Sequence, residues 1–260
     1  MEDHSPSITQ GSGCKVAVIT ATYNAAKHIQ ACMASVESQT YHDTCHVIID
    51  SKSDDDTVAI IQRSSSKKLI YLSERDGGIY SAWNKGVKLV NADWYLFLGS
   101  DDILLPSAIE DLVRQVYCCT DVNLVSAVSM LLQPNGQFAG LFGSAFSRRF
   151  LWHHMPNSNC STIYHRTLLS DDLAFNEGLR SAADYAFLMR MRHSIRSSHS
   201  PVVVSAMRLG GISNNSPMLS IRESFREKLK YYPRYSHFFL LLFYWISIMK
   251  YDLKRIVFKV

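Results

Sequence analysis

Two adjacent carboxylates, those of Asp101 and Asp102, follow an apolar run at residues 94–98 with the sequence WYLFL. Neighbouring carboxylates repel one another, and a divalent cation relieves that repulsion while leaving coordination positions open to phosphate oxygens. The pair therefore indicates a site for a divalent metal, Mn²⁺ or Mg²⁺, beside a bound phosphate. The structural alternative is that these aspartates cap the next helix, which Pro106 is expected to open.

A second acidic segment, residues 50–57, has the sequence DSKSDDDT. It is not a calcium loop, because Lys52 occupies a ligand position and no glycine follows at the turn. It is not a DxDxT nucleophile motif either, because Val58 would fill the last place. Asp50 ends a predicted buried strand and is less easily explained as a cap, so it is a candidate binding residue. The helix that follows is expected to be capped by Asp54, Asp55 and Thr57.

Several reaction classes are excluded by the motifs that the sequence lacks. It contains neither GxGxxG nor GxxxxGK[ST], and neither the GxSxG elbow nor HExxH. Nucleotide binding would therefore depend on a metal and on side chains. The six cysteines form no CxxC pair, so neither a zinc site nor a thioredoxin-like motif is indicated, and they are expected to be reduced thiols of a cytosolic protein.

These side chains must be positioned by a repeating strand–helix pattern in the first hundred residues. Such alternation predicts a mostly parallel sheet with right-handed crossovers, and ligands bind open sheets of this kind beyond the carboxyl ends of the strands. Polar clusters follow all four predicted strands, so we expect the binding site at that edge. The predicted strands are 15–20, 45–50, 68–73 and 94–98, and the predicted helices are 26–39, 55–64 and 79–90.

After residue 120 the pattern changes. Residues 123–132 and 137–142 predict a hairpin, because a Pro-Asn-Gly turn joins them. The remaining predicted elements are strands at 161–165 and 202–207 and helices at 184–192 and 220–232. The fold class expected is therefore α/β, with a Rossmann-type, mixed but mostly parallel sheet flanked by helices and a C-terminal helical extension.

The composition is that of a folded globular protein. Of the 260 residues, 47% are hydrophobic and 19% are charged, which excludes a disordered chain or a coiled coil. The 27 basic and 23 acidic residues give a net charge of +4, too balanced to indicate a partner nucleic acid. We expect one domain at residues 14–232, preceded by a flexible tail at 1–13.

The C-terminal segment, residues 233–260, contains the apolar run FFLLLFYWISIM at 238–249, which is too short to span a bilayer. Basic residues flank this run on both sides. That pattern favours a helix lying in the interface of an anionic membrane, which would be the inner leaflet. The alternative is a helix that packs on the domain or on a partner subunit.

Several motifs in order along the chain resemble a known family. They are residues 18–24 (VITATYN), the loop at Asp50, residues 74–86 (ERDGGIYSAWNKG) and the SDD ending at 100–102. Together they closely resemble bacterial family 2 glycosyltransferases of the GT-A fold, most of all the branch in exopolysaccharide, colanic-acid-like and O-antigen assembly. The resemblance covers roughly residues 14–232 and continues through residues 175–177, 182–185 and 210–213.

The resemblance implies roles on the nucleotide-sugar side of the site, in residues 14–119. Asp50 would contact the nucleotide base, and Thr22 and Asn24 would line the nucleotide. Asp76 would face the sugar donor, and Asp101 would contact the ribose or the donor sugar. The pocket around the donor would be shaped also by Asn84 and Lys85.

The resemblance also implies how the reaction proceeds. Asp102 would hold the metal on the diphosphate, and Asp184, in the acceptor half at 120–232, would be the catalytic base. A carboxylate can take the proton of an acceptor hydroxyl as that hydroxyl attacks the anomeric carbon. The structural alternative for Asp184 is a helix cap before Tyr185.

The chain departs from the family at two places. Ser51 and Lys52 follow the first aspartate where small residues are common. Asn159 and Cys160 stand where the branch usually has His-Gln, which puts the acceptor-side contacts in question. An imidazole could come instead from His153 or His154.

The activity implied is metal-dependent and inverting. A sugar would pass from a UDP- or GDP-sugar to a lipid-linked or growing glycan in cell-surface polysaccharide biosynthesis. The protein would lie on the inner face of the cytoplasmic membrane. Two alternatives remain open: a non-catalytic, membrane-associated assembly protein that keeps the fold, and a sugar-nucleotide nucleotidylyltransferase.

Overall fold

The computed structural model describes residues 14–149, 151–152, 155–169, 174–210, 217–232, 241 and 244–245. The strands are β1 (Cys14–Thr22), β2 (Thr44–Asp50), β3 (Leu69–Ser73), β4 (Ala92–Gly99), β5 (Ile103–Leu104), β6 (Leu124–Leu132), β7 (Phe138–Phe142), β8 (Thr162–His165) and β9 (Ser197–Arg208). The helices are α1 (Ile29–Glu37), α2 (Thr57–Gln62), α3 (Ile79–Leu89), α4 (Ala108–Cys118), α5 (Ala183–Met191) and α7 (Pro217–Tyr231), with single 3₁₀ turns η1 (Asn159–Ser161) and η2 (Arg166–Leu168). The predicted tail at 1–13 lies outside the described residues.

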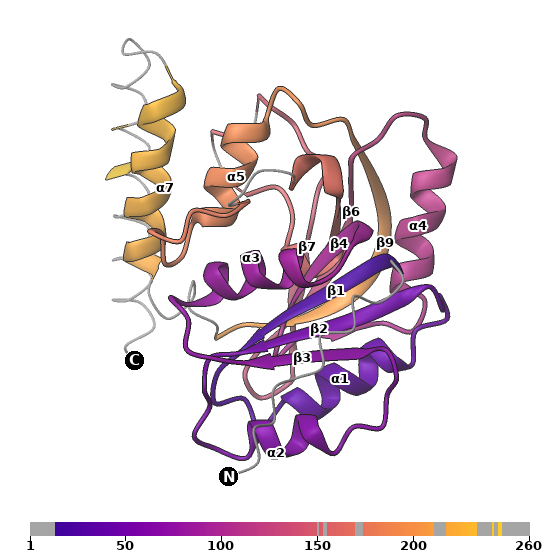
Figure 1. The fold of residues 1–260 in the computed structure, drawn as a ribbon. Coiled ribbons are helices and arrows are strands. Elements are labelled where there is room, and N and C mark those ends of the chain that lie inside the picture. The colour runs from indigo at the N-terminus through magenta and orange to yellow at the C-terminus, as the bar shows by residue number, and fades with distance from the viewer. Residues whose placement is uncertain are drawn as a thin grey trace.

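One mixed sheet of the described residues runs through the molecule in the order β3-β2-β1-β4-β8-β6-β9-β5, with β7 paired to β6 (Figure 1). Its first four strands are parallel, as the strand–helix alternation predicts. The antiparallel strand β8 joins this half to β6, and β9 runs parallel to β6. The predicted α/β fold with a mixed sheet is confirmed.

Alternate residues of the parallel strands enter two different cores. Ala17 and Ile19 of β1 pack in the core that includes α3 and α5, whereas Val16 and Val18 pack in the core that includes α1 and α4. Both faces of the sheet are therefore covered by helices, which explains why these strands are continuous apolar runs rather than alternating ones.

The predicted hairpin is present as β6 and β7, joined by a turn in which Gly136 has a φ of +84°, a conformation that favours glycine. The segment predicted at 202–207 is part of a longer strand, β9. Helix α4 differs from its prediction: it begins at Ala108 with Ser107 as its N-cap, so Pro106 lies just ahead of the helix rather than in its first turn. Asp101 and Asp102 therefore do not cap this helix.

Helix α7 packs alongside α5 (Figure 1). The charged ends of Arg192 and Lys228 lie over aromatic rings, 5.0 Å from the ring centre of Tyr231 and 5.4 Å from that of Tyr185. Beyond α7, the ring of Tyr244 stacks on Phe225 with the ring centres 4.5 Å apart. No helix among the described residues is long and apolar enough to cross a membrane.

Candidate active site

The carboxyl ends of β1, β2, β3 and β4 bring the predicted polar loops to one edge of the sheet. Thr22 is paired in register with Asp50, and Asp50 with Ser73. Because these strands are parallel neighbours, the loops that follow them are also neighbours. The predicted convergence of the polar loops at this edge is therefore present.

Asp50 is fully buried at the end of β2. Its carboxylate accepts hydrogen bonds from the backbone N–H and the hydroxyl of Ser53, at 3.1 and 2.5 Å, and from the hydroxyl of Ser73 at 2.6 Å. These contacts tie β2 to its own loop and to β3. Contact between Asp50 and a nucleotide base stays a prediction.

Asn24 connects the loops after β1 and β2. Its Oδ1 accepts the backbone N–H of Asp54 at 3.0 Å, and its own N–H donates to the hydroxyl of Ser53 at 2.9 Å. Its φ of +49° is the left-handed conformation that asparagine tolerates better than most residues. Asp55 accepts the N–H of Thr57, the first residue of α2, but the N-cap of that helix is Asp56 rather than the predicted Asp54, Asp55 or Thr57. Asn24 is thus placed as a loop brace at the rim of the site.

Two polar atoms near this edge are buried without a protein partner. They are Oγ1 of Thr22, at the end of β1, and Oδ2 of Asp76, in the loop between β3 and α3. Buried polar atoms are nearly always hydrogen-bonded, so each such atom points to a missing group, such as water or a ligand. Both residues belong to the set predicted to bind the nucleotide-sugar.

The Asp76 loop is held from α3. Lys85 forms an ion pair of 2.8 Å with Glu74 and donates to the carbonyl of Arg75 at 3.3 Å, so it braces the loop that carries Asp76. Asn84 points elsewhere. Its amide donates to the Phe175 carbonyl and to Glu177, and it accepts the Phe175 N–H, all at 2.8–2.9 Å.

Those contacts use both amide N–H groups of Asn84 and one of the two lone pairs on its oxygen, all with the segment that leads to Asp184. A direct role for Asn84 at the sugar donor stays a prediction. In the structure, Asn84 holds residues 175–177 against helix α3.

Asp101 and Asp102 converge on the open side of Gly99. A Cβ atom added to Gly99 would lie 2.7 Å from Oδ2 of Asp102 and 3.0 Å from Oδ1 of Asp101. The other oxygen of Asp102, Oδ1, accepts the backbone N–H of Arg208 in β9 at 2.9 Å. One oxygen from each carboxylate is therefore directed toward a common point, an arrangement that fits a divalent cation.

The charge on Asp102 is costly in the protein alone. Burial and then the neighbouring charge of Asp101 raise the pKa of Asp102 to about 7. A cation between the two carboxylates would offset both effects. His28 lies close to the same group: burial, followed by the charges of Arg208 and Lys27, lowers its pKa, while Asp101 opposes that shift.

Asp184 lies in the first turn of α5. Its Oδ1 accepts the hydroxyl of Tyr80 at 3.2 Å and the N–H of Tyr185 at 2.8 Å, and its Oδ2 accepts the Asn159 amide at 2.8 Å. Burial raises the pKa of Asp184, and these hydrogen bonds oppose that shift. The N-cap of α5 is Ala182, so the alternative that Asp184 caps this helix is wrong, and two of its three hydrogen bonds come from outside α5.

The single turn η1 lies between Asp184 and Asp102. Asn159 donates to Asp184, while the thiol of the next residue, Cys160, contacts Asp102 and slightly favours its charged form. Tyr164 holds Asn159 in turn, through a hydrogen bond of 2.8 Å to Oδ1. Asn159 and Cys160, the pair that departs from the family pattern, therefore connect Asp184 with Asp102.

The sequence did not indicate Tyr80 and Asn159 as partners of Asp184, or the effect of the Asp101 charge on His28. Tyr80 lies in the motif at residues 74–86, but only the tertiary structure brings its hydroxyl to Asp184 in α5. His153 and His154 lie outside the described residues, as do residues 211–213 of the last predicted motif. Across the parts of the chain that are described, no group of three or more His, Cys, Asp or Glu side chains forms a metal cluster.

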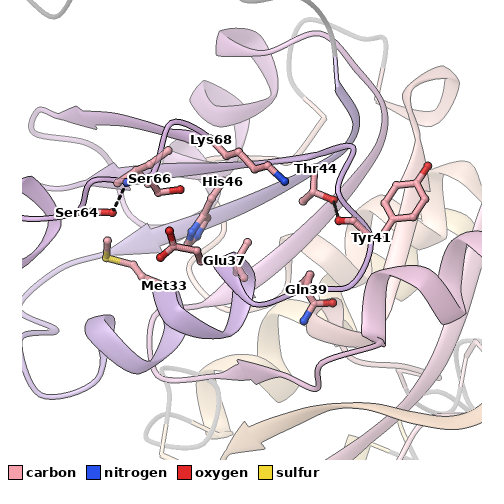
Figure 2. A pocket seen from close by; sticks show the side chains of 11 residues that line it. Met33, Glu37, Gln39, Tyr41, Thr44, His46, Ser64, Ser66 and Lys68 are labelled. Atoms are coloured by element: carbon pink, nitrogen blue, oxygen red, sulfur yellow. Dashed lines mark hydrogen bonds between the residues drawn. The ribbon is translucent and has the colours of Figure 1, made fainter.

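A separate pocket lies at the opposite end of the sheet, near the start of β2 and β3 (Figure 2). It is lined by residues of α1 such as Met33 and Glu37, together with His46 and Lys68. His46 is buried, its Nε2 is 2.9 Å from the Thr20 hydroxyl, and burial lowers its pKa to about 3. This pocket contains none of the predicted site residues.

Comparison with known proteins gives a consistent result. Residues 17–171 match glycosyl transferase family 2. The chain is 29% identical over 209 residues to a PGL/p-HBAD biosynthesis glycosyltransferase of Mycobacterium tuberculosis, covering 76% of this chain and 78% of that protein. It is 35% identical over 182 residues to a chondroitin synthase of Escherichia coli, covering 68% of this chain but only 26% of that protein.

Solved structures share the fold. Residues 1–349 of S. aureus TarS, in complex with UDP-GlcNAc, have a TM-score of 0.67 at 22% identity, over 82% of this chain and 64% of that one. The mannosyltransferase PcManGT from Pyrobaculum calidifontis, in complex with GDP-Man and Mn²⁺, has a TM-score of 0.64 at 16% identity, over 88% of this chain and 66% of that one. The chain thus spans slightly less than two thirds of both structures.

Proposed function

Because the chain belongs to glycosyl transferase family 2, we propose that it is an inverting, metal-dependent glycosyltransferase. It transfers a sugar from a nucleotide-sugar to a hydroxyl group of a lipid-linked or growing glycan in cell-surface polysaccharide biosynthesis. The observation that carries this proposal is the linkage of Asp184 to Asp102 through the adjacent residues Asn159 and Cys160. It gives one site both a base and an anchor for a diphosphate.

The nucleotide-sugar binds at the carboxyl edge of the four parallel strands. Thr22 and Asp76 each offer a buried polar atom that has no protein partner, and a bound nucleotide-sugar would supply it. Asp50 and Asn24 shape the loops on either side, and Lys85 holds the Asp76 loop in place. TarS and PcManGT bind UDP-GlcNAc and GDP-Man respectively, so we propose a UDP- or GDP-sugar here.

Asp101 and Asp102 hold the divalent cation, Mn²⁺ or Mg²⁺. When bound, the cation supplies positive charge to a diphosphate leaving group. The backbone of Arg208 fixes Asp102 so that its second oxygen faces the same point as Asp101. This pair supplies only two ligands, so the remaining coordination positions are available to diphosphate oxygens and water.

Asp184 is the base. Its Oδ1 already accepts two hydrogen bonds, whereas Oδ2 accepts one, from Asn159. The free acceptor position of Oδ2 can therefore take the proton of the acceptor hydroxyl. The new bond forms between that hydroxyl oxygen and the anomeric carbon as the bond from that carbon to the diphosphate breaks, so the anomeric configuration inverts.

The acceptor is proposed to be presented at a membrane surface. Leu241 and Trp245, beyond α7, are 45% and 59% exposed although they are large and apolar. Basic residues flank the apolar run in which they lie, which suits an interface with anionic lipid. We therefore place the protein in the cytoplasm, peripheral to the inner face of the membrane, close to lipid-linked acceptors.

Two other functions fit the observations less well. A non-catalytic assembly protein would have no use for a base held by Tyr80 and Asn159 beside paired carboxylates. A nucleotidylyltransferase would use a basic, glycine-rich loop near its N-terminus, which the loop after β1 is not.

A panel of nucleotide-sugars tests the proposal. Each is added with Mn²⁺ to the full chain, and thermal stabilisation and hydrolysis of the nucleotide-sugar are measured. A ligand that binds only the folded state raises the melting temperature by mass action, so one UDP- or GDP-sugar should stand out, and only with metal. Stabilisation by no nucleotide-sugar, with or without metal, would contradict the proposal.

A further inference from the structure

Helix α7 reaches back to the segment that precedes Asp184. Glu223, in the middle of α7, is only 8% exposed. Its carboxylate accepts three consecutive backbone N–H groups: Arg180 at 3.0 Å, Ser181 at 2.9 Å and Ala182 at 3.1 Å. The hydroxyl of Ser220, one turn earlier, is 2.5 Å from that of Ser181. Glu223 thus holds the residues that lead directly into α5.

This contact places a carboxylate beside the N-terminus of α5, which has no side-chain cap. The N-cap residue of α5 is Ala182, whose side chain has no hydrogen-bonding group. The first N–H groups of a helix need partners, and negative charge is favourable beside them. The Glu223 carboxylate comes from another helix, accepts the N–H of the N-cap residue Ala182 and places negative charge at this helix end, two residues before Asp184.

The same segment is held at its other end from α3. Asn84 bonds the backbone of Phe175 in both directions and also bonds Glu177. Residues 175–182 are therefore fixed by Asn84 at the start and by Glu223 at the end. The position of the Asp184 carboxylate depends on both anchors, because its own backbone follows directly from this segment.

We propose that Glu223 is a positioning residue for the transfer step, acting through Asp184. The inference rests on the proposed function. It assigns to α7, predicted from the sequence as a helix at 220–232, a part in aligning the base with the acceptor hydroxyl. A misplacement of about 1 Å in such a group can cost on the order of 100-fold in rate.

Glu227 provides a matched control on the same helix. It is also buried, at 4% exposed. Its carboxylate pairs with Lys230 at 2.6 Å, whereas the N–H groups of residues 180–182 donate to Glu223. The substitutions Glu223→Gln and Glu227→Gln therefore remove the same charge from the same helix. Only the first removes it from the segment before Asp184.

The experiment compares both variants in the full chain with the nucleotide-sugar identified by the panel. For Glu223→Gln we expect kcat to fall roughly 10- to 100-fold, with the affinity for the nucleotide-sugar unchanged within about twofold. Glu227→Gln should leave both near the wild-type values. A purely structural defect would lower affinity and kcat together, so equal losses in the two parameters, or equal effects of the two variants, would overturn the inference.

A double variant tests the route of the effect. If Glu223 acts through Asp184, then Glu223→Gln should cost little more once Asp184→Asn has removed the base, because effects within one unit are not additive. A full second loss in the double variant would show that Glu223 acts elsewhere. Should Glu223→Gln not fold, Glu223→Asp keeps the charge but shortens its reach, and wild-type kcat in that variant would equally overturn the inference.

Amide hydrogen exchange separates this inference from the proposed function. Exchange of the amides at residues 180–186 should accelerate in Glu223→Gln and not in Glu227→Gln, whatever the enzyme transfers. If the wild-type chain transfers no sugar, the proposed function fails while the exchange result still reports on the anchor. Unchanged exchange in Glu223→Gln would remove the basis of the inference.

Discussion

Asn159 donates a hydrogen bond of 2.8 Å from Nδ2 to Oδ2 of Asp184, while its own Oδ1 accepts the hydroxyl of Tyr164. The amide is therefore held in one orientation, with its N–H toward the carboxylate. This bond favours the charged form of Asp184 and opposes the effect of burial. An asparagine that departs from the family pattern thus supports the residue proposed as the base.

Replacing Asn159 should change the pH dependence of the reaction. Asn159→Ala removes a contact that lowers the pKa of Asp184, so that pKa rises. A base acts only when deprotonated, so the acidic limb of the kcat–pH profile should move to higher pH and the rate near neutrality should fall. Asn159→His, which supplies a ring N–H, is the matched variant and should retain more of the rate. An identical acidic limb in wild type and Asn159→Ala would contradict the assignment.

Asp184→Asn tests the chemistry directly. The substitution keeps the size of the side chain and an oxygen that can accept the hydrogen bonds of Tyr80 and Tyr185, but it removes the proton acceptor. We expect transfer to fall by roughly 10²–10⁴-fold, with nucleotide-sugar and metal affinity nearly unchanged. That combination is typical of an interaction used only in the transition state. Near-wild-type transfer to the true acceptor would move the base elsewhere, with His153 or His154 next to test.

Asp102→Asn should abolish metal-dependent binding of a nucleoside diphosphate, measured by calorimetry. The lost binding free energy is expected to be on the order of several kcal/mol, as for breaking a close charge pair. In the wild type a proton competes with the metal, so apparent metal affinity should fall as pH drops below about 7. If Asp102→Asn still bound a nucleoside diphosphate in a metal-dependent way, the proposal that Asp102 holds the metal would be wrong.

Asp102→Asn should also change the folding stability of the protein. The folded-state pKa of Asp102 lies above its value of 3.8 in an unfolded chain. Its contribution to stability is therefore fully present below pH 3.8 and is lost as pH rises toward 7. Without metal at pH 8, Asp102→Asn should be more stable than the wild type by an amount on the order of a few kcal/mol, because Asn keeps the bond to the Arg208 N–H. Chemical denaturation at pH 4 and pH 8 measures the difference.

Gly99→Ala should weaken the metal site without harming the fold. The new methyl group would lie 2.7 Å from Asp102 and 3.0 Å from Asp101, so both carboxylates must turn aside. We expect metal affinity to fall by about tenfold or more, about 1.4 kcal/mol. Gly77→Ala is the control, because its methyl group would meet Ser81 at an ordinary 3.7 Å. Equal metal affinity in both variants would count against convergence of the carboxylates at Gly99.

Deleting residues 236–260 tests the membrane proposal. The deletion leaves α7 and Glu223 in place but removes Tyr244 from the ring of Phe225. We expect the truncated chain to stay folded and to lose flotation with vesicles containing anionic lipid. Unchanged flotation would exclude this segment as the membrane anchor. Aggregation of the truncated chain would favour the alternative in which the segment packs on protein.

Much of the structure of residues 14–119 could be predicted from the sequence. Apolar runs of five or six residues, alternating with amphipathic segments, can fold only with both faces covered, which makes the parallel sheet predictable. The carboxyl ends of parallel strands share one edge of the sheet. The convergence of Thr22, Asp50 and the Asp101–Asp102 pair could therefore be predicted from the sequence. Local patterns carry this information because each feature depends on residues close together in the chain.

The structure of residues 120–232 depends on contacts between residues that are distant in the sequence, and local patterns do not predict such contacts. Asp184 meets Tyr80 and Asn159 across separations of 104 and 25 residues, and Glu223 reaches residues 180–182 across about 40. The sequence by itself determined which carboxylates end the parallel strands. Only the packing of α3, α5, α7 and η1 against one another decided which side chains hold the proposed base, because a hydrogen bond needs two groups within about 3 Å whatever their distance along the chain.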